Sequence, residues 1–123
     1  MAVRRLTSFP VLPLAARTAS VNSADFTNNS GRGVRVWIKC TVDPAAASVT
    51  FTIQGKTAQG DYYTILASAA VADVGTTTLV VHPEIAASAN AVANTVLPAT
   101  WRVAAVATDA DSLTYSAGAE YLA

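Results

Sequence analysis

The chain has 123 residues, of which 52% are hydrophobic and only 13% are charged, and its eight basic side chains balance eight acidic ones. This length is typical of one domain, and a net charge of zero argues against a nucleic-acid partner, since nucleic-acid binding needs clustered Lys and Arg. A typical soluble domain has about 25% charged residues. The surface is therefore expected to be unusually neutral, which suits a protein that packs against its neighbours.

The single cysteine, Cys40, allows no disulfide within the chain, which fits assembly in a reducing cytoplasm. No apolar run approaches the roughly 20 residues of a membrane-spanning helix, so no membrane partner is expected. The first residues are similar to a secretory signal, but Pro10 and Pro13 interrupt the apolar stretch, and we therefore expect no such signal.

Residues 1–19 are predicted to form an extended N-terminal arm, and residues 20–123 the folded domain. Pro10 and Pro13 favour extended backbone, and the apolar residues around them show no clear period. Two alternatives are open for such an arm: it docks on a partner protein, or it folds back as an edge strand of its own domain. For docking, the candidate contact residues are Arg4, Arg5, Phe9, Leu12, Leu14 and Arg17.

From Ser20 onward, short segments of alternating apolar and polar residues are separated by turn residues. The clearest segment is 34–42, where apolar side chains alternate with Arg35, Trp37 and Lys39, the period-two pattern of a half-buried strand. Further strands are predicted at 49–54, 62–68, 76–82, 101–108 and 113–119 and near 21–26, and the Ala-rich segment 84–97 is either a helical turn or a long loop. About seven short strands are typical of a single all-β sandwich domain, immunoglobulin-like or jelly-roll-like.

The inward positions of these strands predict the core, with residues 33–42 and 100–119 as central strands. The predicted core side chains are Val36, Ile38, Cys40, Phe51, Ile53, Trp101, Val103 and Tyr115.

The residues that could support catalysis or bind a cofactor have simpler interpretations. Gly55-Lys56-Thr57 ends like a phosphate-binding loop, but the motif's first glycine is missing and a strand follows instead of a helix. His82 is the only histidine, too little for a zinc site or a catalytic triad. Asp109 and Asp111 are expected to form a tight turn rather than a metal site. We therefore predict no enzyme activity, no metal and no cofactor.

The remaining candidate for binding is the outer face of segment 34–42. Trp37 lies there between Arg35 and Lys39, and Trp and Arg are enriched at the energetic centres of protein interfaces. Two interpretations are equally open: these three residues contact a partner, or this face packs within the domain while the two cations extend outward.

Four sequence phrases resemble a family of small structural proteins of tailed bacteriophages, which includes head decoration and minor structural proteins. The phrases are Tyr62-Tyr63-Thr64, Val74–Thr77, Leu97-Pro98 with Thr100–Val103, and Thr114–Ser116 with Gly118-Ala119. The resemblance covers roughly residues 20–122 and contains no catalytic signature. It implies a virion protein.

Together, the resemblance and the neutral β-domain predict a capsid decoration, or cement, protein on the outer surface of the head. Its expected partners are the major capsid protein and copies of itself, with a trimer favoured. Two alternatives are open: a minor tail or baseplate protein, and a carbohydrate-binding module for host attachment that uses Trp37, Tyr62 or Tyr63 as a stacking platform.

Overall fold

The computed structural model describes residues 8–29, 31–43 and 47–123, and within these residues the secondary structure is entirely β, with no helix. The ten strands are β1 (Ser8–Arg17), β2 (Val21–Asn22), β3 (Phe26–Thr27), β4 (Gly33–Val42), β5 (Val49–Lys56), β6 (Tyr62–Ala67), β7 (Gly75–Val81), β8 (Val92–Ala93), β9 (Thr100–Ala107) and β10 (Leu113–Leu122). It follows that the described part of the chain contains no helix able to cross a membrane.

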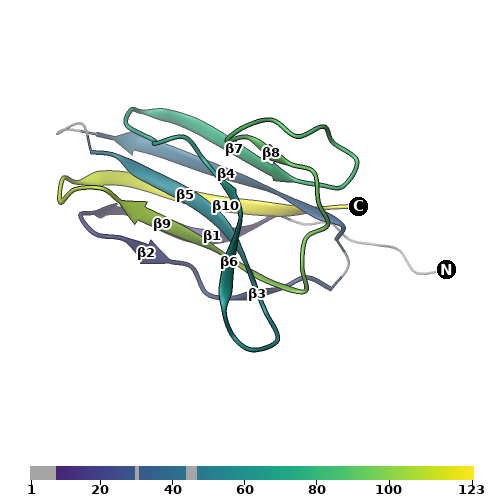
Figure 1. The fold of residues 1–123 in the computed structure, drawn as a ribbon. Coiled ribbons are helices and arrows are strands. Elements are labelled where there is room, and N and C mark those ends of the chain that lie inside the picture. The colour runs from purple at the N-terminus through teal and green to yellow at the C-terminus, as the bar shows by residue number, and fades with distance from the viewer. Residues whose placement is uncertain (1–7, 30, 44–46) are drawn as a thin grey trace.

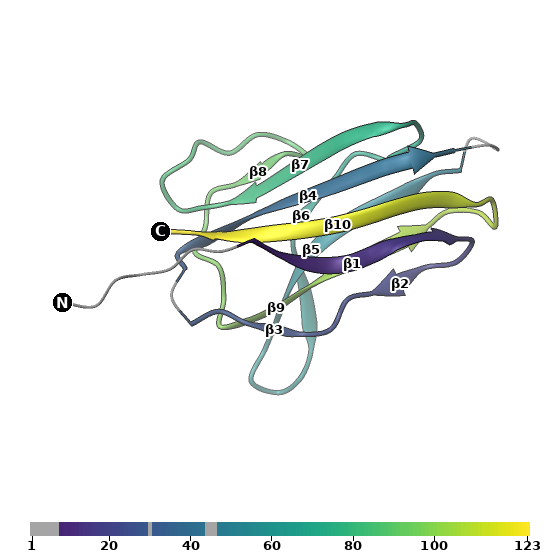
Figure 2. The same cartoon turned by 180° about the vertical axis from the view of Figure 1, so that it is seen from behind.

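The strands form two five-stranded sheets that pack face to face (Figure 1). Sheet A has the order β1-β10-β4-β7-β8, and sheet B has the order β2-β9-β5-β6 with β3 also paired to β9. Figure 2, the opposite view, brings sheet A to the front. The contact between the sheets is direct: the ring of Phe51 on β5 meets the ring of Tyr115 on β10 edge-on, with 5.0 Å between centroids.

The sequence predicted six of these strands and the core correctly. β4, β5, β9 and β10 lie where alternation places them, and β6 and β7 match the predicted segments 62–68 and 76–82 to within one residue at each end. The eight predicted core side chains are each at most 1% exposed. The number of strands exceeds the expected seven because the segment near residue 21 divides into β2 and β3, the Ala-rich segment 84–97 contains the short strand β8, and residues 8–17 form a strand.

Residues 8–17 correct the expectation of an extended arm, since they form the edge strand β1 of sheet A. β1 pairs antiparallel with β10, from Ser8 opposite Glu120 to Arg17 opposite Leu113. Val11 and Leu12 are buried in the core, which explains why this segment contains apolar residues. The prolines are compatible with a strand because an edge strand has no partner on one side. Residues 1–7, with Arg4 and Arg5, lie outside the described residues.

One end of the molecule is closed by an aromatic cluster that joins both sheets: Phe9 from β1, Phe26 from β3, Trp101 from β9 and Tyr121 from β10. Trp101 is fully buried, and its indole N–H donates to the Tyr121 hydroxyl at 3.2 Å. The Tyr121 hydroxyl in turn donates to the Thr27 carbonyl at 3.0 Å. β1 is therefore part of the structure that holds the two sheets together.

Candidate protein-binding groove

The outer face of sheet A carries a groove of about 520 Å³ between β1 and β4, with β10 as its floor. The groove is mainly apolar, and the lining residues that the sequence analysis did not select are small residues and prolines. The lining consists of Ser8, Phe9, Pro10, Leu12, Pro13, Leu14, Trp37, Ser116, Ala117, Gly118 and Ala119.

Strand register explains why a groove forms at this place. Trp37 on β4 lies opposite Gly118 on β10, and because Gly118 has no side chain, the sheet surface is hollow beside the indole. On the other side, β1 has register shifts between Pro10 and Leu12 and again between Leu12 and Ala15. These bulges disturb the regular alternation of the strand, and Leu14 is left 60% exposed at the groove.

Two cationic side chains lie beside the groove, and they differ in whether they form an ion pair. Arg35 precedes Trp37 on the outer face of β4 and forms an ion pair with Glu120 of β10, with 2.9 Å between Nη1 and Oε1. Lys39 follows Trp37 on the same face, is exposed, and has no ion pair among the described residues. One end of the groove is therefore neutral, whereas the end near Lys39 is positively charged.

The structure brings together most of the residues that the sequence analysis selected. Phe9, Leu12, Leu14 and Trp37 line one groove, and Arg35 and Lys39 flank the tryptophan. Phe9 also belongs to the aromatic cluster, and Leu12 is only 4% exposed, so both form the back of the groove. The sequence analysis did not select the other lining residues, which are Ser8, Pro10, Pro13, Ser116, Ala117, Gly118 and Ala119. The one available signal was a glycine inside an otherwise alternating strand, a position that often marks close approach by another backbone.

Arg17 has contacts within its own domain. Its guanidinium donates to the carbonyls of Pro13 and Tyr115, the latter at 3.0 Å. The same group lies 4.7 Å from the centroid of the Tyr115 ring. Arg17 therefore fastens the bulged end of β1 to β10.

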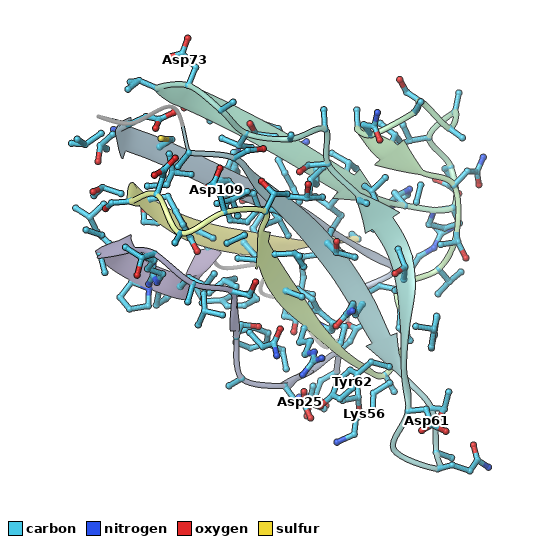
Figure 3. All side chains as sticks on the ribbon, turned by 60° about the vertical axis from the view of Figure 1, so that its left-hand side comes forward. Asp25, Lys56, Asp61, Tyr62, Asp73 and Asp109 are labelled. Atoms are coloured by element: carbon cyan, nitrogen blue, oxygen red, sulfur yellow. The ribbon has the colours of Figure 1, made fainter. Side chains whose placement is uncertain are left out.

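Sheet B carries a different surface, a network of polar and aromatic side chains that joins the loop between β2 and β3 to the sheet (Figure 3). The Tyr62 hydroxyl donates to the Asp25 carboxylate at 2.7 Å, and the Lys56 ammonium donates to it at 3.0 Å. Arg102 stacks on the Tyr62 ring, with its guanidinium carbon 3.4 Å from the ring centroid, and donates to Gln54 at 2.8 Å. These five residues satisfy one another, as expected of a structural network.

The hydrogen bonds from Tyr62 and from Lys56 hold the pKa of Asp25 below its ordinary value. A lowered pKa means that the ionised carboxylate stabilises the fold above the unfolded-state pKa of about 3.9, and that this contribution is lost as the pH falls through the folded-state pKa. We expect Asp25→Asn to lower the melting temperature slightly at pH 7, and the difference from wild type to shrink below about pH 4.

Thermal melting of both proteins between pH 3 and 7 checks this prediction. Tyr62→Phe removes one donor and should reduce the effect of Asp25→Asn, whereas Tyr63→Phe, at the neighbouring position outside the network, should leave it unchanged. An Asp25→Asn difference that persists undiminished at pH 3 would show that the network does not depend on the carboxylate charge.

The two tyrosines considered for a sugar-stacking platform, Tyr62 and Tyr63, each contact another part of the domain. Arg102 covers one face of Tyr62. Tyr63 is 44% exposed, but its ring lies over Gly55, where an added Cβ would be 2.4 Å from the ring. One face of each tyrosine ring is therefore occupied within the domain, whereas Trp37 lines the groove on sheet A.

The groups considered for chemistry have structural contacts. The His82 Nδ1 accepts from the Glu84 N–H at 3.1 Å, and its Nε2 lies 3.0 Å from the Ala123 carbonyl. Cys40 is buried, and burial raises the pKa of its thiol. The Asp111 N–H donates to the Asp109 carboxylate at 3.1 Å, as in the predicted turn. No group of three or more potential metal ligands occurs among the residues that the structure describes.

Comparisons with known proteins give a similarity of fold. No protein-family model matches the chain, and no curated protein matches it in sequence. The crystal structure of the SPBc2 prophage-derived protein YomS is similar, with a TM-score of 0.54 and 11% identity over 98% of this chain and 96% of that one. The structure of infectious bursal disease virus, Gx strain, matches with a TM-score of 0.49 and 10% identity over 94% of this chain and 31% of that one.

Proposed function

We propose that this protein is a bacteriophage structural protein, a capsid decoration protein that binds the outer surface of the head and stabilises it. The observation that carries the proposal is the groove on sheet A, an apolar depression beside the partly buried Trp37 on an otherwise weakly charged domain. Trp37 and the side chains around it are of the kind found at the centres of protein interfaces.

The fold supports the same proposal. A prophage-derived protein shares it over nearly the full length of both chains, so the domain as a whole, rather than one motif, has a phage counterpart. In our proposal the protein is made in the cytoplasm of the bacterial host and works on the outside of the virion. Its contribution is binding energy, with no catalysis and no cofactor, and the major capsid protein is the partner.

Contacts between copies are a second part of the proposal. Several large apolar side chains outside the groove are exposed, among them Val42, Val74, Val96 and Val106. Identical chains associate most often with closed cyclic symmetry, and a trimer would match the three-fold positions of an icosahedral shell. Sedimentation equilibrium of the purified protein should give three times the chain mass; a single-chain mass at all concentrations, with no contact between copies on the particle, would contradict the trimer.

Copy number in purified virions separates the decoration role from the tail role. A decoration protein covers the head, so quantitative mass spectrometry of intact particles should find it at a level comparable to the major capsid protein. A level of only a small fraction of the major capsid protein would indicate a minor tail or baseplate protein. Absence from particles would contradict both roles.

A further inference from the structure

We propose that the groove on sheet A binds one extended peptide segment of the major capsid protein, with proline or apolar side chains against Trp37 and a carboxylate next to Lys39. This inference rests on the proposed decoration function and specifies the element of the partner that is recognised. Three observations carry it: the glycine at the groove floor, the composition of the groove walls and the distribution of charge.

Gly118 lies inside the ten-residue strand β10, where glycine is unfavourable and needs a reason. Its own structure does not supply one. The backbone there has no positive φ, and among the residues that the structure describes a Cβ added at Gly118 would meet only the Phe9 carbonyl, at an ordinary contact distance of 3.5 Å. At Gly33, by contrast, a Cβ would lie 2.0 Å from the Val81 carbonyl. Gly118 therefore keeps the groove floor open for something that approaches from outside.

The walls of the groove suit an extended segment. Trp37 forms one wall, and Pro10, Pro13 and Leu14 form the other. Grooves lined by aromatic side chains bind extended, proline-rich segments, which lose little conformational entropy on binding. The groove volume of about 520 Å³ is within the range of about 300–1,000 Å³ typical of ligand pockets. A groove of this size accommodates a few side chains of a peptide and is too small for the face of another domain.

Charge sets the direction and chemistry of the peptide. Arg35 is neutralised by Glu120 at one end of the groove, whereas Lys39 at the other end has no ion pair among the described residues. Lys39 lies opposite Ser116, which lines the groove. A peptide carboxylate at this end would gain the Lys39 ammonium and find the Ser116 hydroxyl nearby. An acidic residue is therefore expected beside the apolar part of the segment.

The test uses the full-length protein and phage heads purified from a mutant that lacks it, with binding measured by co-sedimentation. Gly118→Val fills the groove floor with a side chain that strands favour, so the melting temperature should be unchanged or higher. Its affinity for heads should fall by about tenfold or more. Lys39→Glu should also weaken binding. Thr78→Val is the matched control, because Thr78 lies opposite Trp37 on the other neighbouring strand, outside the groove lining, and should bind like wild type.

The outcomes separate this inference from the function on which it rests. If wild type and Gly118→Val bind heads equally, the groove is not the docking site and the decoration role stands. If wild type does not bind heads, the decoration role fails and the peptide proposal fails with it. If Gly118→Val abolishes self-association and leaves head binding intact, a second copy occupies the groove and the peptide proposal is wrong.

Discussion

Removal of residues 1–17 is expected to unfold the protein. The deletion takes away β1, and with it the buried side chains of Val11 and Leu12 and the Phe9 ring that contacts Phe26, Trp101 and Tyr121. Burying one such side chain contributes about 1.5–3 kcal/mol, so the loss is roughly 5 kcal/mol or more, similar to the whole stability of many domains. The deletion also exposes the edge of β10, whose unpaired backbone N–H and C=O groups can then pair with another chain and cause aggregation.

Two single substitutions in β1 provide the matched test of this result. Leu12 is 4% exposed, and Leu12→Ala should lower the free energy of unfolding by about 2–5 kcal/mol. Leu14 is 60% exposed, and Leu14→Ala should change it by less than about 0.5 kcal/mol. Denaturant unfolding measures both. A truncated protein that melts near the full-length temperature, or equal effects at the two leucines, would show that β1 is not an integral strand.

Trp101→Ala is expected to be the most damaging single substitution at the closed end of the molecule. Trp101 is fully buried, contacts the rings of Phe9, Phe26 and Tyr121, and donates a hydrogen bond to Tyr121. Truncation leaves a large cavity between the sheets and removes the donor from the Tyr121 hydroxyl, at a cost of about 3–5 kcal/mol.

The other tryptophan is the control for Trp101→Ala, because the same substitution at Trp37 removes a side chain from the outer face of sheet A. Trp37→Ala should cost well under half as much in unfolding free energy, and should act on head binding instead. Denaturant unfolding followed by far-ultraviolet circular dichroism measures both variants. Equal stability losses would mean that Trp37 is part of the core and that the groove assignment is wrong.

The central strands could be predicted because a strand buried on one face shows alternating apolar and polar residues in its sequence. Val36, Ile38 and Cys40 alternate with outward residues, and each is at most 1% exposed. β1 shows no such alternation. The register shift between Pro10 and Leu12 accompanies the burial of two consecutive residues, Val11 and Leu12, so the alternation that reveals a strand is absent. The arm and the edge strand could therefore not be distinguished from sequence alone.

The candidate site was predictable only in part, for a related reason. Alternation placed Trp37 on the outer face of its strand, which the structure confirms. The other side of the groove depends on pairings between residues far apart in the chain, such as Trp37 with Gly118 and Pro10 with Gly118. The network of Asp25, Lys56 and Tyr62 likewise joins distant segments. No local pattern reports such pairings.

Binding of the purified protein to phage heads that lack it is the most direct test of the decoration role. Increasing amounts of full-length protein are sedimented with expanded heads, and separately with tails, and the bound protein is measured against the major capsid protein. We expect saturable binding to heads at a fixed ratio to the major capsid protein, and heads that resist heat better when saturated. Folded protein that stays in the supernatant with heads at every concentration, or that sediments only with tails, would contradict the decoration role.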